Sequence, residues 1–224
     1  KEFHLSSADP NLVEGEVRKL GHTNYDVADQ LSNMGLEAIH PKAAKTLRQA
    51  DVPLRVTNAF EPHDPGTLID DQPAETPGAE IVTGLKVHAL ELFEQDMVGV
   101  KGYDARILEV LTRHGIRIVS KTSNANTITH YVDAPLRALR KVEADLNKVY
   151  PSAELTLQPL AIAAVIGRDL TGLHVLGEGL KALGAADVQF VVSRESLAAS
   201  ISALHGALMP AAQVADFKPG KKAA

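Results

Sequence analysis

One stretch, residues 90–132, restricts the fold more than any other part of this chain, because its pattern changes from strand to helix and back. An apolar run at 90–93 ends in a glycine-containing turn at 96–102, and apolar residues then recur at helical spacing. His114-Gly115 closes that helix with a cation in the last turn and a glycine after it, and a β-branched run follows. This half of the stretch therefore predicts strand, loop, helix and strand.

The residues that follow complete a compact unit. Asn124-Ala125-Asn126 predicts a turn, and residues 127–132 predict a returning strand. Pro135 opens a second helical pattern, and residues 153–157 alternate like a last strand. The order βαββαβ is that of a ferredoxin-like unit. In such a unit the first strand-to-helix loop presents N–H groups at a helix N-terminus, which suits a carboxylate, so a ligand sensor is expected rather than a catalyst.

Composition excludes several kinds of partner. The 224 residues are 45% hydrophobic and 23% charged, which allows one or two modest cores and fits two small domains. A net charge of −5 and the lack of a basic amphipathic segment argue against nucleic acid and membranes as partners. The absence of cysteine excludes a disulfide framework and is compatible with a cytoplasmic protein. The chain starts without methionine in what reads as mid-domain sequence, so a fragment is expected.

Turn and cap residues divide the rest of the chain. Asn24 is expected to cap one helix and Pro41 to open another before the acid- and proline-rich linker at 71–80. Beyond residue 158 the pattern gives a buried strand, a loop at Gly167–Gly172, a helix, a strand and a last helix, which is one strand short of a second ferredoxin-like unit. Residues are therefore expected to be absent near Leu183–Asp187. Residues 210–224 are expected to form a flexible tail.

The motifs of the central stretch resemble a known family. D-M-x-G-x-x-G-Y, then R-H-G-I and T-S-N-A-N, are similar to the first ACT domain of an aspartate kinase. Residues 34–41 are similar to the family's Gly-Ala-Lys-Val-Leu-His-Pro signature, and residues 52–60 and 65–69 to its Ile-Pro-Ile-Arg-Val and Pro-Gly-Thr strands. Ser7–Asn11 sits where the family has Thr-Thr-Asp-Pro-Arg at the nucleotide, and departs at the arginine.

This resemblance implies an α/β (α+β) fold: the C-terminal part of an amino-acid-kinase domain followed by two ferredoxin-like ACT domains. The kinase part would cover 1–70 and the linker 71–80. The first ACT domain would cover 88–158. It would be inserted into the second, which takes 81–87 and 159–209.

The resemblance also implies where ATP with Mg would lie in an intact enzyme. The matching positions here are Asn11, Glu37 and Ala38. Glu37 replaces the family's ATP-contacting lysine, and a carboxylate there repels phosphates. The family's Lys-x-Gly-Gly-Thr opening, which handles phosphate charge, is not in these residues. No catalytic residue is therefore expected in this chain, and no histidine shows the paired spacing of a metal site.

An amino-acid effector is expected between the two loops of the first ACT domain. A tight turn at 96–103 and a plain hairpin turn at 124–126 are the simpler explanations of the same residues. The family instead places an amino acid between them, with the carboxylate at helix N–H groups and the ammonium near Asp96. The expected effector-binding residues are Asp96, Met97, Gly102, Tyr103, Ser123, Asn124 and Asn126.

Two functions from different classes follow. The first is an aspartate kinase, which converts ATP and L-aspartate to 4-phospho-L-aspartate and ADP, with this chain carrying mainly its feedback-regulatory region. The second is a stand-alone ACT-domain regulatory subunit without catalysis of its own. A free amino-acid sensor for transcription is a more distant alternative. The expected effector is lysine, threonine or methionine, and a homodimer through ACT domains is expected because Ile128 and Val132 belong to a sheet that needs cover.

Overall fold

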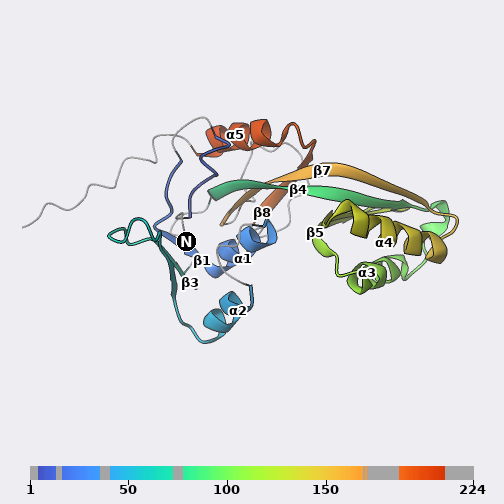
Figure 1. The fold of residues 1–224 in the computed structure, drawn as a ribbon, viewed down its shortest axis with the longest axis horizontal. Helices are drawn as coiled ribbons and strands as arrows, with labels where there is room; N and C mark the ends of the chain where they lie inside the picture. The colour runs from blue at the N-terminus through green and yellow to red at the C-terminus, as the bar shows by residue number, and fades with distance from the viewer. Residues whose placement is uncertain are drawn as a thin grey trace, which may run out of the picture. The chain divides into compact units, whose positions relative to one another are not determined.

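The computed structural model describes residues 5–13, 17–35, 41–72, 78–168, 170 and 187–209 (Figure 1). The chain divides into two compact units. The first comprises Lys1–Gly84, Ala163–Phe190 and Glu195–Ala224, and the second comprises Leu85–Ile162 and Val191–Arg194. The predicted kinase end and much of the predicted second ACT domain thus lie in one unit, and their separate domain boundaries stay predictions.

The second unit has the predicted βαββαβ order. Its elements are β4 (Gly78–Phe93), α3 (Tyr103–Arg113), β5 (Arg117–Ser123), β6 (Thr127–Asp133), α4 (Leu136–Val149) and β7 (Glu154–Arg168), with a short 3-10 helix η1 (Gln95–Met97) after β4. β4 and β7 are the strands that continue into the other unit. The strand order of the whole sheet is β5-β6-β4-β7-β8, with β8 at Asp187–Val192.

Register decides which residues of this sheet face the helices. β6 pairs antiparallel with β4, Leu92 opposite Ile128 and His88 opposite Val132. Alternate side chains share a face, so Leu92, Ile128 and Val132 pack together with apolar residues of α3 and α4 in one core. Ile128 is 5% exposed and Val132 0%. The expectation that these two residues need cover from a second copy is therefore wrong, because helices of the same unit cover them.

Both long strands extend beyond the predicted segments. β4 is one strand of 16 residues that begins at Gly78, so residues 78–80 are strand and not linker. β7 is one strand of 15 residues that includes Gly167 and Arg168, so these two residues are strand and not the predicted loop. A Cβ on Gly167 would lie 2.1 Å from the Gly78 carbonyl oxygen, and glycine is what allows this close approach. The helix predicted after Gly172, residues 183–186 near the expected gap, and the 210–224 tail lie outside the described residues.

The first unit contains a small sheet of order β1-β3-β2. Its elements are β1 (His22–Asn24), α1 (Tyr25–Asn33), α2 (Pro41–Gln49), β2 (Leu54–Val56), β3 (Thr67–Asp70) and the C-terminal helix α5 (Leu197–Leu208). Buried residues of α1, α2, β2 and β3 form one core: Tyr25, Ala28, Ala44, Val56 and Ile69.

Local sequence explains where these helices start. The Asn24 side chain accepts a hydrogen bond from the Val27 N–H at 2.9 Å, which is the predicted N-cap of α1. Pro41 opens α2, where its missing N–H costs nothing. No helix among the described residues is long and apolar enough to cross a membrane.

Candidate functional site

The two loops expected to bind an effector lie at the same end of the second unit's sheet. Phe93, the last residue of β4, pairs with Thr127, the first residue of β6. The next residue, Glu94, donates its backbone N–H to the Asn126 carbonyl at 2.9 Å. The strand-to-helix loop and the β5–β6 hairpin are therefore joined directly, as the two-loop hypothesis requires.

Glu94 joins the two loops and is not among the residues predicted for the site. Glu94 is only 6% exposed. Its carboxylate accepts hydrogen bonds from the Ser152 hydroxyl at 2.6 Å and from the Asp96 N–H at 3.5 Å. A buried carboxylate is retained only where donors satisfy it. The signal in the sequence was an acidic residue placed directly after an apolar strand and followed by a turn.

The N-terminus of α3 offers unpaired donors to a ligand. Its N-cap is Gly102, with φ +95°, and no side chain caps the first turn. The first N–H groups of a helix lack partners within the helix and carry its positive dipole end. Glycine at position 102 permits the left-handed conformation that aims this turn. A carboxylate fits here on charge and on hydrogen bonding.

The side chains of two predicted site residues, Tyr103 and Met97, pack against other residues of the same unit. The Tyr103 ring stacks on Tyr150, with ring centroids 4.7 Å apart and an interplanar angle of 12°. The Tyr150 hydroxyl donates to the Tyr103 carbonyl at 3.1 Å, and burial raises the pKa of Tyr150. Met97 is 6% exposed and belongs to the core. The Met97 side chain is therefore not available to a ligand, whereas the Tyr103 ring is held in place by Tyr150.

Asp96 is the acidic group in the expected position for an ammonium. It lies in η1 and is exposed, while its backbone N–H is bonded to Glu94. Among the described residues, none donates a hydrogen bond to its carboxylate. The carboxylate is thus available to a ligand.

The asparagine side chains of the hairpin form more hydrogen bonds within the hairpin than expected. The Asn124 side-chain oxygen accepts from the N–H groups of Asn126 at 3.1 Å and Thr127 at 2.9 Å, so it caps its own turn. The Asn126 side-chain oxygen accepts from the Thr127 hydroxyl at 3.4 Å. Ser123 is exposed at the end of β5. Of the three, Asn124 best matches the plain-turn explanation.

A cluster of three polar side chains lies beside the same helix start and was not anticipated. Lys121 Nζ lies 2.5 Å from Asp104 Oδ2, and His130 Nε2 lies 3.3 Å from Asp104 Oδ1. The His130 side chain is 1% exposed, and its ring nitrogens have no hydrogen-bond partner among the described residues. Burial lowers the pKa of His130, against an opposing effect of Asp104. Histidine at an inward position of a strand was the sequence signal.

The segment expected to lie at a nucleotide is a tight turn in the first unit. Asp9 Oδ1 accepts from the backbone N–H of Asn11 at 2.8 Å and from its side-chain Nδ2 at 3.0 Å. Asn11 is exposed, and Glu37 and Ala38 lie outside the described residues. Among the described residues, no group of three histidine, aspartate or glutamate side chains could hold a metal ion.

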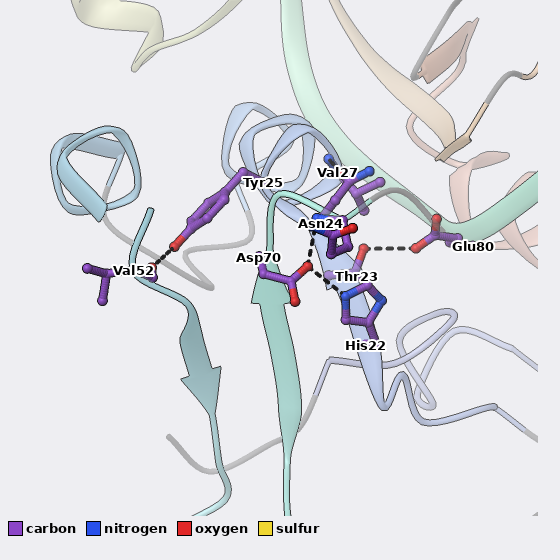
Figure 2. A network of polar contacts seen from close by, with 9 residues as sticks. His22, Thr23, Asn24, Tyr25, Val27, Val52, Asp70 and Glu80 are labelled. Carbon is purple, nitrogen blue, oxygen red and sulfur yellow. Dashed lines mark hydrogen bonds and ion pairs between the residues drawn. The ribbon is translucent and has the colours of Figure 1, made fainter. Parts of the chain in front are cut away.

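A second polar network in the first unit is structural (Figure 2). His22 Nε2 lies 2.8 Å from Asp70 Oδ1, which links the parallel strands β1 and β3. The Thr23 hydroxyl donates to Glu80 at 2.8 Å, and the Tyr25 hydroxyl donates to the Val52 carbonyl at 2.6 Å. Burial of its carboxylate raises the pKa of Glu80, and one of the two carboxylate oxygens has no partner among the described residues. These contacts join neighbouring elements of the first unit.

Comparison with known proteins finds relatives among the aspartate kinases. No family model matches the chain. The chain is 46% identical over 226 residues to the aspartate kinase Ask_Ect of Stutzerimonas stutzeri. This alignment covers 93% of the chain and 48% of Ask_Ect. This chain is related to the aspartate kinases. Chloroplastic aspartokinase 3 of Arabidopsis thaliana is 23% identical over 90% of the chain and 40% of its own length.

The fold agrees with solved aspartate kinase structures. E. coli aspartokinase III in complex with lysine and aspartate superposes with a TM-score of 0.76 at 18% identity, over 92% of this chain and 49% of that one. The aspartate kinase of Clostridium acetobutylicum gives 0.75 at 18% identity, over 92% and 52%. The chain spans about half the length of the aspartate kinases it matches.

Proposed function

We propose that this chain is the feedback-regulatory region of an aspartate kinase whose intact form transfers the γ-phosphoryl group of MgATP to the side-chain carboxylate of L-aspartate. The observation that carries the proposal is the 46% identity to Ask_Ect over 93% of the chain. We place the protein in the cytoplasm.

The effector would be a free amino acid bound between the two joined loops. Its carboxylate would accept hydrogen bonds from the first N–H groups of α3, at Gly102 and Tyr103, and its ammonium would face Asp96. Lysine, threonine and methionine are the candidates; lysine is present in the E. coli aspartokinase III complex, which has the same fold. A ligand held by both loops would stiffen the junction at Glu94, and this is how binding could reach the rest of the protein.

Calorimetric titration with lysine, threonine and methionine tests this site. Asp96→Ala should weaken binding of the effector by roughly tenfold to a hundredfold, the loss expected for one charge-assisted contact, without changing stability. Asp26→Ala is the matched control, because the Asp26 side chain is 77% exposed on α1 in the other unit. Parent-like affinity in Asp96→Ala would show that the ammonium is bound elsewhere.

The alternative function, a stand-alone regulatory subunit, predicts a different activity. The intact aspartate kinase would phosphorylate aspartate and lose that activity when the effector is added, and Asp96→Ala would remain active. A subunit without its own catalysis would bind the amino acid and show no phosphorylation of aspartate in the absence of a catalytic partner.

A further inference from the structure

Ser7 lies at the base of the turn that contains Asn11. Its N–H donates to the Arg18 carbonyl at 2.7 Å, and its hydroxyl accepts from the Arg18 N–H at 2.9 Å. The residue before it, Ser6, forms an antiparallel bridge with Lys19. Ser7 is 0% exposed, whereas Asn11 is exposed. The position of the turn therefore depends on what holds Ser7.

Two further contacts hold Ser7, one from β4 and one from α5 near the C-terminal end of the sequence. Its carbonyl accepts from the Val82 N–H at 2.8 Å. Its hydroxyl lies 2.9 Å from Nε2 of His205, on the last turn of α5. In Figure 1, α5 is the orange helix beside the blue N-terminal segment.

The face that α5 buries ends in a polar residue. Leu197, Ile201 and His205 follow at four-residue spacing and are 7%, 0% and 5% exposed. An apolar residue in place of His205 would bury its surface without needing a partner, whereas the imidazole must be satisfied. Its partner is the Ser7 hydroxyl, so this end of α5 is aligned by a directional bond.

Hydrogen-bond accounting fixes the direction of that bond. The Ser7 hydroxyl has one proton and already accepts from Arg18. If His205 Nε2 donated as well, the Ser7 proton would be buried without an acceptor in the described part of the chain. The satisfied arrangement has Ser7 donating to an unprotonated Nε2, with the ring proton on Nδ1. A second proton on the ring removes this acceptor and reverses the bond.

We propose that His205 is a positioning residue through which helix α5 holds the turn at residues 8–12 in place by its hydrogen bond to Ser7. The proposal rests on the proposed function in one respect, since the assignment of this turn to a nucleotide comes from the family resemblance. Burial lowers the pKa of His205, and the positive charge of Arg18 lowers it further, so the acceptor form is present at neutral pH. Arg18 is the charged group that acts on the ring from the described part of the chain.

Hydrogen exchange of the 224-residue chain tests the contact itself. His205→Ala should lower the protection factors of the Arg18, Val82 and Leu12 amides about tenfold at pH 7.5, because a buried hydroxyl loses its acceptor. Amides of α3 and α4 should not change. His205→Gln restores an acceptor that does not titrate, so its protection should approach that of the parent at pH 7.5. In the parent, protection at the same amides should fall as the pH is lowered below about 6.5, and His205→Gln should lack this step.

A matched variant separates positioning from general stability. Ile201→Val trims the same buried face of α5 one turn earlier and leaves the Ser7 bond intact. It should lower the thermal midpoint slightly and keep the parent's acid step at Arg18 and Val82. Unchanged exchange in His205→Ala, or the same acid step in His205→Gln as in the parent, would overturn the proposal.

The intact kinase tests the link to the nucleotide. His205→Ala should raise KM for ATP about fivefold or more and leave kcat at saturating ATP near the parent value, and His205→Gln should restore KM. Parent-like KM in His205→Ala, together with lost protection of the turn, would overturn that link. A chain that binds no amino acid would contradict the proposed function instead, and the exchange result would still stand.

Discussion

Glu80 shows how a single buried residue makes stability depend on pH. It accepts one hydrogen bond from Thr23, and its other oxygen has no partner among the described residues. Burial raises its pKa, so the folded protein favours the protonated form more than the unfolded chain does. The stability that this preference contributes is complete below the unfolded pKa, about 4.3–4.5, and is lost as the pH rises through the folded pKa.

Glu80→Gln should therefore be at least as stable as the parent at pH 7, by up to about 1 kcal/mol, because the amide is neutral at every pH. The difference between variant and parent should shrink as the pH is lowered to about 4. Urea unfolding at several pH values measures it. Glu109→Gln is the control, since its ion pair with Arg113 is exposed and contributes little. A variant less stable than the parent at pH 7 would mean that the Glu80 charge is favourable.

At the scale of elements, the two ends of α3 serve different purposes. Gly102 begins the helix with φ +95°, and Gly115 follows its end with φ +64°. A Cβ at either position would meet no atom within 4 Å, so the cost of a side chain there is backbone strain alone. Only the N-terminal end is part of the proposed effector site.

Gly102→Ala and Gly115→Ala should each lower the free energy of unfolding by about 1–2 kcal/mol, the cost of a left-handed conformation for an L-residue. Only Gly102→Ala should also weaken binding of the effector, about tenfold, because relieving the strain turns the first N–H groups of α3 away from the ligand. Chemical unfolding and calorimetry on the same samples separate the two effects. Equal loss of affinity in both variants would remove the N-terminus of α3 from the site.

At the scale of the whole molecule, the open edge of the sheet is the feature that favours self-association. β5 is an end strand in the order β5-β6-β4-β7-β8, and its last three residues, Lys121 to Ser123, are exposed. An unpaired strand edge is a template for a second chain. The apolar residues Ile128 and Val132 no longer support a dimer, because they are buried within the unit.

A homodimer is therefore expected at micromolar concentration by light scattering. Thr122→Glu places a charge on the β5 edge and should shift the equilibrium toward monomer, since two copies paired there would bring like charges together. Thr112→Glu makes the same change on the exposed face of α3 and should leave the dimer unchanged. A monomeric parent protein would contradict the expectation, and a dimer insensitive to Thr122→Glu would move the interface to another surface.

The sequence by itself determined the local elements of this protein. The Asn24 cap, the Gly115 helix end, the βαββαβ order and the meeting of the two loops were all readable, because caps, turns and hydrophobic periodicity act over a few residues and the ferredoxin-like topology places the loops together. The family resemblance, later supported by the comparisons, was likewise carried by short motifs.

Only the tertiary structure decided what each side chain contacts. It buried Met97 in the core, stacked Tyr103 on Tyr150 and used Asn124 to cap its own turn. It also paired Ser7 with His205, 198 positions away along the chain. These outcomes depend on strand register and on partners distant in sequence, and a local pattern contains no information about which of several buried polar groups will meet.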